Sequence, residues 1–563
     1  MNAANIYSST ASLCSLISQT RIREGYKVTT ATEQSTEQAA KSYSYDETPY
    51  ESYPFPQSHP DRLATMATLF GMTPQSIESC RVLELGCASG GNLIPMAFTL
   101  PGSTFVGIEL SEKQVSEGKK NIEGIGLKNV EIKHESIMNV NKDSLGVFDY
   151  IIVHGVFSWV PDQVQDKIME ICQECLAPNG VAYISYNTYP GWHYRGMIRD
   201  MMLYHTEPLK EPAAKAQQAR ALLDFLSTSV PTENHAFGIM LKNELDMLRQ
   251  QKDYYLLHDY LEEANIPLYF HQFAERAGKA DLQYLGEADF STMLSSNFSK
   301  EVSETLKRIA NDIVRTEQYM DFVRNRTFRQ TLLCRKDVVL NRNLTPESVT
   351  KLYVSSSAKP ENENFDANLN QHEKFSMPDG KTFATGFPLV RAAFHHLYKI
   401  FPQCIPFEDL LQVARSSVAS EKIQDANAFH QEKQALAGDL LTCYTIGLAS
   451  FRTRSLPFVS EISSHPKVSD QVRHQAEHQM VVTNQLHELV PIDVFAGRLL
   501  RLADGTRDRN AILNELIELA KKGELVVQKD GKQLQDDSAL REVLDNALEQ
   551  RLQLLPKSAV LVS

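Results

Sequence analysis

The segment VLELGCASGGN at residues 82–92 constrains the fold of this chain more than any other feature. Apolar residues lead into Glu84, glycines follow at Gly86, Gly90 and Gly91, and a helix is predicted from about Asn92. This order of strand, glycine-rich turn and helix is typical of an α/β sheet that binds a cofactor at the carboxyl ends of its strands. Because glycine has no side chain, the backbone of such a turn can approach a ligand closely. A plain tight turn is the alternative interpretation.

The spacing within this loop separates three kinds of nucleotide site. A Walker loop requires GxxxxGK[ST], and no lysine follows Gly91. A nicotinamide fingerprint requires GxGxxG, whereas Gly86, Ala88 and Gly91 give GxAxxG. The loop is more similar to that of class I methyltransferases, which bind S-adenosylmethionine (SAM) and carry an acidic residue two positions before the first glycine. Glu84 holds that position, and the similarity implies that it holds the positively charged methionine end of SAM.

Further apolar segments predict the rest of an α/β sheet. Strands that alternate with helices imply a parallel sheet with right-handed crossovers. The last two segments match the strand pair with which class I methyltransferases end, the final strand being antiparallel. Helical periodicity at residues 195–280 and 290–327 predicts helical insertions around these final strands. The predicted strands after the first are 104–110, 130–136, 148–160, 180–187, 281–290 and 328–336.

Carboxylates at the ends of the first strands are the main cofactor candidates. Glu109 ends the second predicted strand, 25 residues after Glu84, where a carboxylate can accept both ribose hydroxyls. Glu135 and Ser136 follow the third strand and are placed to meet the adenine edge. The complete predicted cofactor set is Glu84, Gly86, Cys87, Ala88, Gly90, Gly91, Asn92, Glu109, Leu110, Glu135, Ser136, His154 and Val156.

Several segments together resemble one bacterial family. They are residues 46–65, LELGCASGGNLIPMA, HGVFSWVP, SYNTYPGWH and residues 258–277. The resemblance is to SAM-dependent methyltransferases with a regulatory domain, a group that includes rickettsial lysine methyltransferases of outer-membrane proteins. It implies SAM as cofactor, a protein substrate with accessible lysines, and a homodimer formed through the helical insertions. A small-molecule N- or O-methyltransferase and a SAM-binding scaffold without transfer activity remain alternatives.

The resemblance also implies where the methyl acceptor lies, because this family keeps the residues that touch the methyl group after the fourth strand. Aromatic faces can hold a methylated ammonium by cation–π attraction. An asparagine can accept an N–H bond from the amine, and His154 can instead contact SAM. A structural role is the alternative for each residue. The predicted catalytic set is His154, Trp159, Tyr186, Asn187 and Tyr189.

The chain of 563 residues is long enough for several domains. Prolines between aromatic residues predict an extended segment at 46–60. The resemblance implies that this segment forms a lid over the SAM pocket, and a strap packed on the core is the alternative. Helices followed by small β ribbons in the last part resemble winged-helix modules. The predicted divisions are a flexible tail (1–40), a methyltransferase domain (41–340) with a regulatory region (195–325), a linker and hairpin (341–385), an α+β module (386–480) and a winged-helix-like module (481–563).

The composition of the chain limits the classes of partner that it can bind. The net charge is −13 and no long lysine or arginine run occurs, which excludes nucleic acid as the main partner, since phosphate binding needs concentrated positive charge. No apolar run approaches the roughly 20 residues of a membrane span. Without a sustained apolar segment at the N-terminus, we expect a cytoplasmic protein.

His474, Glu477 and His478 spell the inverted zinc-protease motif, but no downstream carboxylate stands out as a third ligand, so we predict no metal.

Overall fold

The computed structural model describes residues 52–262, 264–368, 372–418, 426–456, 458–459, 461–529, 532–534 and 536–562. The predicted tail (1–40) and the beginning of the predicted extended segment at 46–60 lie outside these ranges. Within the described ranges, no helix combines the length and the apolar character needed to cross a bilayer.

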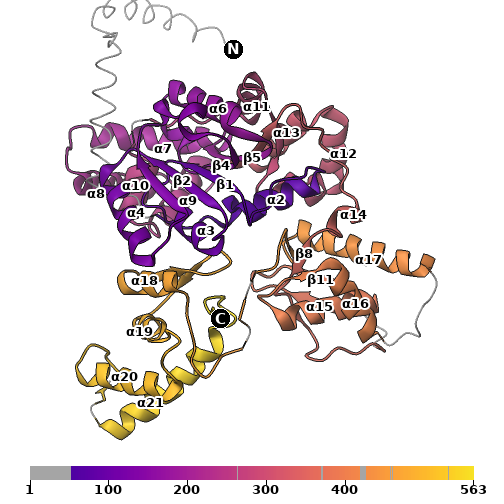
Figure 1. The fold of residues 1–563 in the computed structure, drawn as a ribbon. Helices are drawn as coiled ribbons and strands as arrows, with labels where there is room; N and C mark the ends of the chain where they lie inside the picture. The colour runs from indigo at the N-terminus through magenta and orange to yellow at the C-terminus, as the bar shows by residue number, and fades with distance from the viewer. Residues whose placement is uncertain are drawn as a thin grey trace, which may run out of the picture. The chain divides into compact units, whose positions relative to one another are not determined.

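A seven-stranded mixed sheet carries the methyltransferase-like part of the chain (Figure 1). Its strand order is β3-β2-β1-β4-β5-β7-β6. Strands β1 to β5 pair in parallel, whereas β7 runs antiparallel to both of its neighbours. The predicted sheet and its late antiparallel strand are therefore confirmed. The strands are β1 (Arg81–Leu85), β2 (Thr104–Glu109), β3 (Val130–His134), β4 (Phe148–Val153), β5 (Leu176–Asn187), β6 (Leu282–Glu287) and β7 (Phe328–Arg335).

Both faces of the sheet are buried, which explains the nearly continuous apolar runs of its central strands. On one face Val82, Tyr150 and Tyr183 pack with residues of α2 and α3. On the other face Leu83 and Ile151 pack with residues of α6 and α11. The helices around the sheet are α2 (Pro60–Leu69), α3 (Leu93–Thr99), α4 (Glu112–Ile125), α5 (Lys142–Leu145), α6 (Asp162–Cys175) and α11 (Phe270–Lys279).

Strand β5 begins four residues earlier than the predicted segment 180–187. Leu176 already pairs with Phe148, and regular pairing resumes between Val181 and Tyr150. The intervening residues form a bulge on the β5 side, which tolerates Pro178 because residues of a bulge need not donate to the ladder. Residues 178–180 therefore belong to the strand, and α6 ends at Cys175.

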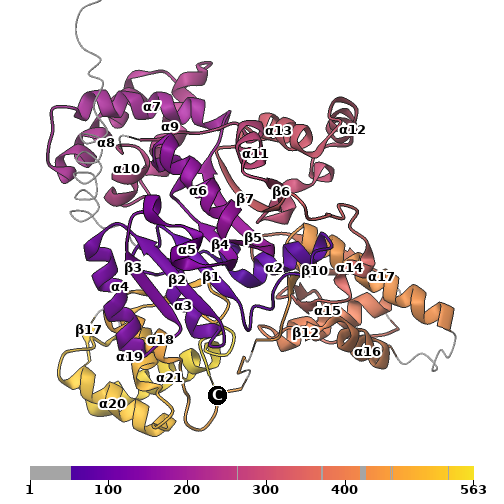
Figure 2. The same cartoon turned by 45° about the horizontal axis from the view of Figure 1, so that its top comes forward.

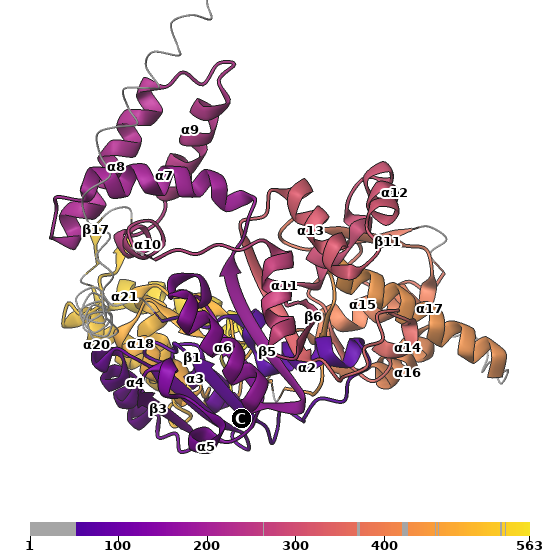
Figure 3. The same cartoon turned by 90° about the horizontal axis from the view of Figure 1, so that it is seen from above.

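The predicted helical insertions are present. Helices α7 to α10 share an apolar core built around Ala219, Leu223, Leu241 and Leu245, and they form a group of their own in Figure 3. The second insertion contains two helices. Asp312 caps the second of them by accepting the Arg315 N–H at 2.8 Å. The insertion helices are α7 (Gly191–Thr206), α8 (Pro212–Ser229), α9 (Ala236–Leu248), α10 (Asp253–Asp259), α12 (Lys300–Ile309) and α13 (Ile313–Arg324).

Two further α+β groups follow, orange and yellow in Figure 2. The first contains α14 (Pro346–Val349), α15 (Pro388–Ile400), α16 (Phe407–Ser417) and α17 (Ala426–Thr445), with strands β8 (Tyr353–Ser355), β9 (Lys359–Pro360), β10 (Glu373–Ser376), β11 (Thr382–Thr385), β12 (Ile405–Pro406) and β13 (Ser450–Arg452). The second contains α18 (Asp470–His478), α19 (Val494–Leu502), α20 (Arg509–Lys521) and α21 (Asp537–Leu554), with strands β14 (Val481–Thr483), β15 (Leu489–Pro491), β16 (Gln528–Lys529) and β17 (Lys532–Gln533). The apolar core of the second group includes Val468 and Val472 of its N-terminal part.

Candidate cofactor and acceptor site

The glycine-rich loop between β1 and α3 is built by close backbone approaches. A Cβ on Gly86 would lie 2.5 Å from Val156 Cγ2, and a Cβ on Gly91 would lie 2.1 Å from the Ser52 carbonyl oxygen. Ala88 adopts a left-handed φ of 50°, a conformation that glycine adopts more easily. Its N–H donates to Glu109 Oε2 at 2.9 Å, so the loop and the end of β2 are joined directly.

Glu84 is a buried carboxylate with one unpartnered oxygen. It is only 2% exposed, and its Oε1 accepts from Asn92 Nδ2 at 2.7 Å. Its Oε2 has no hydrogen-bond partner among the described residues. Burial raises the pKa of Glu84 to about 8, the Asn92 bond opposes this shift, and the negative charge of Glu109 adds to it. An orphaned buried oxygen of this kind fits the ammonium group at the methionine end of SAM.

Glu109 lies half-buried at the end of β2, held by backbone groups. Its Oε1 accepts the N–H groups of Leu110 and Ser111, both at 2.9 Å, and its Oε2 accepts that of Ala88. A carboxylate offers about four acceptor positions. At least one position therefore remains for a ribose hydroxyl.

Glu135 and Ser136 form a local turn after β3. Glu135 Oε1 accepts from Asn139 Nδ2 at 2.6 Å and from the Ser136 N–H at 2.9 Å, and these two bonds lower the pKa of Glu135. Ser136 Oγ accepts from the Met138 N–H at 3.3 Å. The Glu135 N–H also donates to the Glu109 carbonyl at 3.0 Å, which holds this turn beside the end of β2. Its contact with adenine stays a prediction.

Residues 52–59, part of the segment predicted as a lid or a strap, pack on the glycine-rich loop. Ser52 Oγ accepts from the Gly91 N–H at 2.7 Å, and the Phe55 N–H donates to Asn92 Oδ1 at 2.9 Å. The Phe55 ring stacks on His154 with 3.6 Å between the ring centroids. The alternation of aromatic residues and prolines predicted an extended segment, and these contacts support its proposed role as a lid.

His154 lies between aromatic rings at the end of β4. Its Nδ1 is 2.8 Å from Tyr183 Oη, and its ring also lies near that of Phe55. Burial lowers the pKa of His154 to about 3, so the imidazole is neutral at physiological pH. The Gly155 N–H donates to Ser185 Oγ at 2.8 Å. Tyr183 and Ser185, which lie on the same face of β5, were not predicted as site residues, because β5 is buried on both faces and its sequence does not mark that face.

Tyr186 faces the opposite side of β5. It is 1% exposed, stacks on Phe273 of α11 at 4.1 Å, and its hydroxyl lies 3.2 Å from Thr331 Oγ1. Its neighbours are core residues between the sheet and α11. These contacts favour the alternative stated in the sequence analysis, that Tyr186 has a structural role.

Of the other acceptor candidates, Asn187 ends β5, Tyr189 follows it, and Trp159 lies in the segment after β4. The Asn187 N–H donates to Ser158 Oγ at 2.8 Å, and its Nδ2 donates to Asn265 Oδ1 at 3.0 Å. Tyr189 stacks on His193 with 4.0 Å between centroids. Trp159 meets Trp192 edge-on at 6.2 Å. The aromatic pairs combine residues from the ends of two strands with the first turn of α7.

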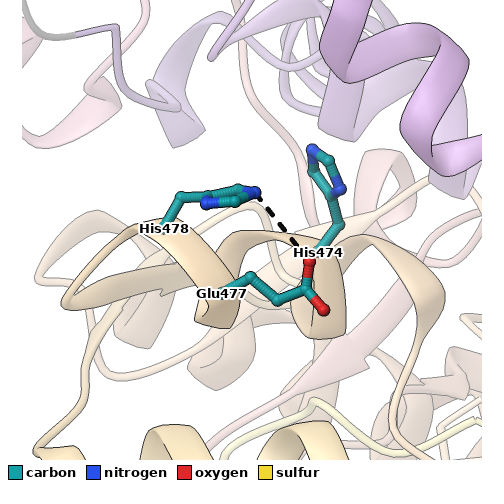
Figure 4. Close-up of side chains that lie close together, drawn as sticks. All are labelled: His474, Glu477 and His478. Carbon is teal, nitrogen blue, oxygen red and sulfur yellow. Dashed lines mark ion pairs between the residues drawn. The ribbon is translucent and has the colours of Figure 1, made fainter.

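His474, Glu477 and His478 lie together on α18, as Figure 4 shows. His478 Nε2 is 3.8 Å from Glu477 Oε2, whereas His474 Nε2 lies 3.3 Å from Asn121 Oδ1 of α4. Glu477 and His478 are exposed. His474 thus serves as a contact to α4, and the absence of a bound metal at this cluster stays a prediction.

Comparisons with known proteins agree with this geometry. Three protein-family models match the chain. Residues 77–258 match the model described as "methyltransferase domain", residues 252–335 match "predicted methyltransferase regulatory domain", and residues 464–560 match "PKMT, C-terminal winged helix domain". An uncharacterized protein of Rickettsia prowazekii (strain Madrid E) is 38% identical over 92% of this chain and 93% of its own length.

Two solved structures of PKMT2 from Rickettsia typhi, one in complex with AdoHcy, are similar over nearly the whole chain. Both are 32% identical, with TM-scores of 0.82 and 0.81, and the match covers 91% and 92% of this chain and 100% of each solved chain. The fold and the loop define a class I SAM-dependent methyltransferase. More particularly, the chain belongs to the family of methyltransferases with a regulatory domain and a PKMT winged-helix domain that includes the R. typhi protein.

The raised pKa of Glu84 predicts a pH dependence of cofactor binding. Below pH 8 the empty site holds a neutral carboxyl, whereas the ligand's ammonium requires the carboxylate, so binding must release a proton. An α-amino group stays charged below about pH 7.7. We therefore expect the affinity for S-adenosylhomocysteine (SAH), the demethylated product, to rise by up to about tenfold per unit between pH 6 and 7.5. Calorimetry in buffers of different ionisation enthalpy counts the proton, and a pH-independent affinity contradicts the assignment.

Proposed function

We propose that this methyltransferase transfers methyl groups from SAM to lysine side chains of a protein substrate. The observation that carries the proposal is the match to PKMT2, which extends through the regulatory and winged-helix domains as well as the cofactor-binding domain. PKMT abbreviates protein lysine methyltransferase. A likeness limited to the cofactor-binding domain would not favour a protein substrate over a small molecule.

The residues on the cofactor side of the site are proposed to bind SAM and to orient it. Glu84 binds the ammonium of the methionine end, the backbone of Gly86–Gly91 makes room for the ligand, and Glu109 accepts from a ribose hydroxyl. Phe55 and the rest of residues 52–59 cover the loop and keep water out. Bound SAM supplies a methyl group on a cationic sulfur.

The acceptor-side residues are proposed to position the amine. Lysine has a reference pKa near 10.4, so a proton must be lost before transfer, and partial burial in an aromatic site favours that loss. Trp159 and Tyr189 offer ring faces to a methylated ammonium, and Asn187 offers a carbonyl oxygen to an amine N–H. With a pKa of about 3, His154 is a poor general base and is assigned to packing beside the cofactor.

The assay that tests this function uses methyl-labelled SAM with bacterial surface proteins and, separately, with small-molecule extracts. We expect label in protein, recovered as methyl-lysine by mass spectrometry, and a loss of this label in the Glu84→Gln variant. Label confined to small molecules contradicts the lysine proposal and favours a small-molecule methyltransferase. Tight SAH binding without turnover on any acceptor favours the scaffold alternative.

We also propose that the protein works in the cytoplasm and as a homodimer. The support for dimerisation is that each of α7, α8 and α9 carries a large exposed apolar side chain. Tyr204 is 83% exposed, Phe225 62% and Ile239 48%. Charged substitutions at Phe225 and Ile239 would then convert a dimer to a monomer in light scattering. A wild-type protein that is monomeric at micromolar concentration contradicts this part of the proposal.

A further inference from the structure

A histidine of the winged-helix domain reaches the cofactor loop. His487 lies in the turn between β14 and β15, is only 3% exposed, and places its Nε2 2.8 Å from Asn92 Oδ1. Asn92 directly precedes α3 and also binds Glu84. A residue from the C-terminal domain is thus two hydrogen bonds away from the carboxylate proposed to hold the cofactor.

The orientation of the Asn92 amide follows from its partners. The Phe55 N–H can only donate, so the atom that it meets at 2.9 Å is the amide oxygen. Asn92 Nδ2 then donates to Glu84 Oε1 at 2.7 Å and to Ser58 Oγ at 3.1 Å. Because Oδ1 faces His487, the imidazole must carry its proton on Nε2 and donate. All four hydrogen-bonding positions of the amide are therefore used.

The turn that carries His487 is firmly braced. Asn484 Oδ1 accepts the N–H groups of Leu486 and Glu488, each at 2.9 Å, and the His487 N–H donates to the Asn484 carbonyl at 3.0 Å. The Gln485 N–H donates to the Ala559 carbonyl at 2.9 Å, which ties the turn to the C-terminal end of the domain. His487 itself adopts a left-handed φ of 64°. The backbone holds this ring toward Asn92 at some conformational cost.

We infer that His487 is a positioning residue for cofactor binding, which acts by locking the Asn92 amide so that Glu84 presents its free oxygen to the ligand. If the amide were reversed, its carbonyl oxygen would face the carboxylate that Glu84 forms when the ligand binds, and the Phe55 N–H would lose its acceptor. The His487 bond stabilises the productive orientation. This inference rests on the proposed role of Glu84, and it makes the winged-helix domain part of the cofactor site.

The test compares His487→Phe, which keeps a ring but removes the donor, with His487→Gln, which keeps an N–H donor. Phenylalanine and glutamine would both have to adopt the left-handed φ of residue 487, so the backbone cost is shared. The difference in SAH affinity between the two variants therefore reports the hydrogen bond. We expect His487→Phe to weaken SAH binding about tenfold, the loss of one buried hydrogen bond, and His487→Gln to stay within about threefold of wild type. The exposed His478→Phe is the matched control, with unchanged affinity. Calorimetric SAH titration is the readout, beside thermal denaturation of the ligand-free protein.

A double variant tests whether His487 acts through Asn92. In an Asn92→Ala background, His487→Phe should cause no further loss of SAH affinity, because the bond has already been removed. Additive losses, equal losses in the Phe and Gln variants, or wild-type affinity in His487→Phe each overturn the inference. Should His487→Phe fail to fold, ¹⁵N spectra of the wild-type imidazole decide: a protonated Nε2 that shifts on SAH addition supports the inference, and no shift overturns it. Absence of SAH binding by the wild type would instead refute the proposed function.

Discussion

Replacement of Glu84 by glutamine is expected to weaken SAH and SAM binding about a hundredfold while making the ligand-free protein more stable. The loss follows because a buried charge-assisted hydrogen bond to the ligand's ammonium contributes up to about 3 kcal/mol. Glutamine can still accept from Asn92, so the bond that orders the loop is retained. Binding and stability should therefore change in opposite directions.

The gain in stability follows from the sign of the pKa shift. The pKa of Glu84 rises from an unfolded value near 4.5 to about 8 in the folded protein. The stability linked to the neutral carboxyl is fully present below pH 4.5 and is lost as the pH rises through 8. A glutamine has no such loss, which predicts a gain of roughly 2–4 kcal/mol at pH 8 and almost none at pH 4.5.

The measurement is thermal or chemical denaturation at both pH values, beside calorimetric titration with SAH. Glu131→Gln is the matched control, since Glu131 is an exposed carboxylate on β3 and should change neither property. A destabilised Glu84→Gln protein, or one that binds SAH as wild type does, is incompatible with the assigned role of Glu84.

Replacement of Arg329 by methionine is expected to destabilise the protein by about 3–5 kcal/mol, because it removes the cation that three buried carboxylates share and leaves only Arg326 beside two of them. Arg329 is fully buried on β7 and donates to Glu287 Oε1 at 2.6 Å, Asp321 Oδ2 at 2.8 Å and Glu317 Oε2 at 3.0 Å. Its guanidinium also lies 3.9 Å from the centroid of the Phe270 ring. The arginine thereby joins β6, β7, α11 and α13 in the regulatory region.

The pH dependence of this loss provides a second readout. Burial raises the pKa of Glu317 to about 7, against the attraction of Arg329. The penalty for removing Arg329 should grow between pH 6 and 8, and Glu317→Gln should recover part of it in the double variant. Arg315→Met is the control, because Arg315 is exposed with its nearest carboxylate oxygen at 4.0 Å, and we expect a cost below about 0.5 kcal/mol. Equal denaturation midpoints for the two methionine variants would contradict the prediction.

The sheet could be predicted from the sequence because its signals are local. Apolar segments, the glycine-rich turn and the carboxylates at Glu84 and Glu109 appear within short windows, and the parallel pairing of β1 to β5 follows from the alternation of strands and helices. The start of β5 was placed too late because Pro178 and Gly180 resemble a turn, whereas the structure accommodates them in a bulge.

The site was less predictable, for two physical reasons. Strand β5 is buried on both faces, so its apolar pattern gave no contrast between Tyr186, which faces α11, and Tyr183, which meets His154. The contacts of Phe55 and His487 with Asn92 join residues far apart in the chain, and no local periodicity reports such a contact. Resemblance to a family implied the cofactor and a lid over its pocket, but not these individual contacts.

The bond between Asn92 and His487 has a consequence for biosynthesis. The two residues are 395 positions apart, and Asp61 is likewise bound by Arg452 and Thr453, about as distant in the chain. A ribosome releases the glycine-rich loop long before it makes the histidine, so nascent protein must pass through a stage in which the amide lacks this donor. Cofactor affinity should therefore mature late, only once the last domain has emerged and folded against the rest of the newly made chain.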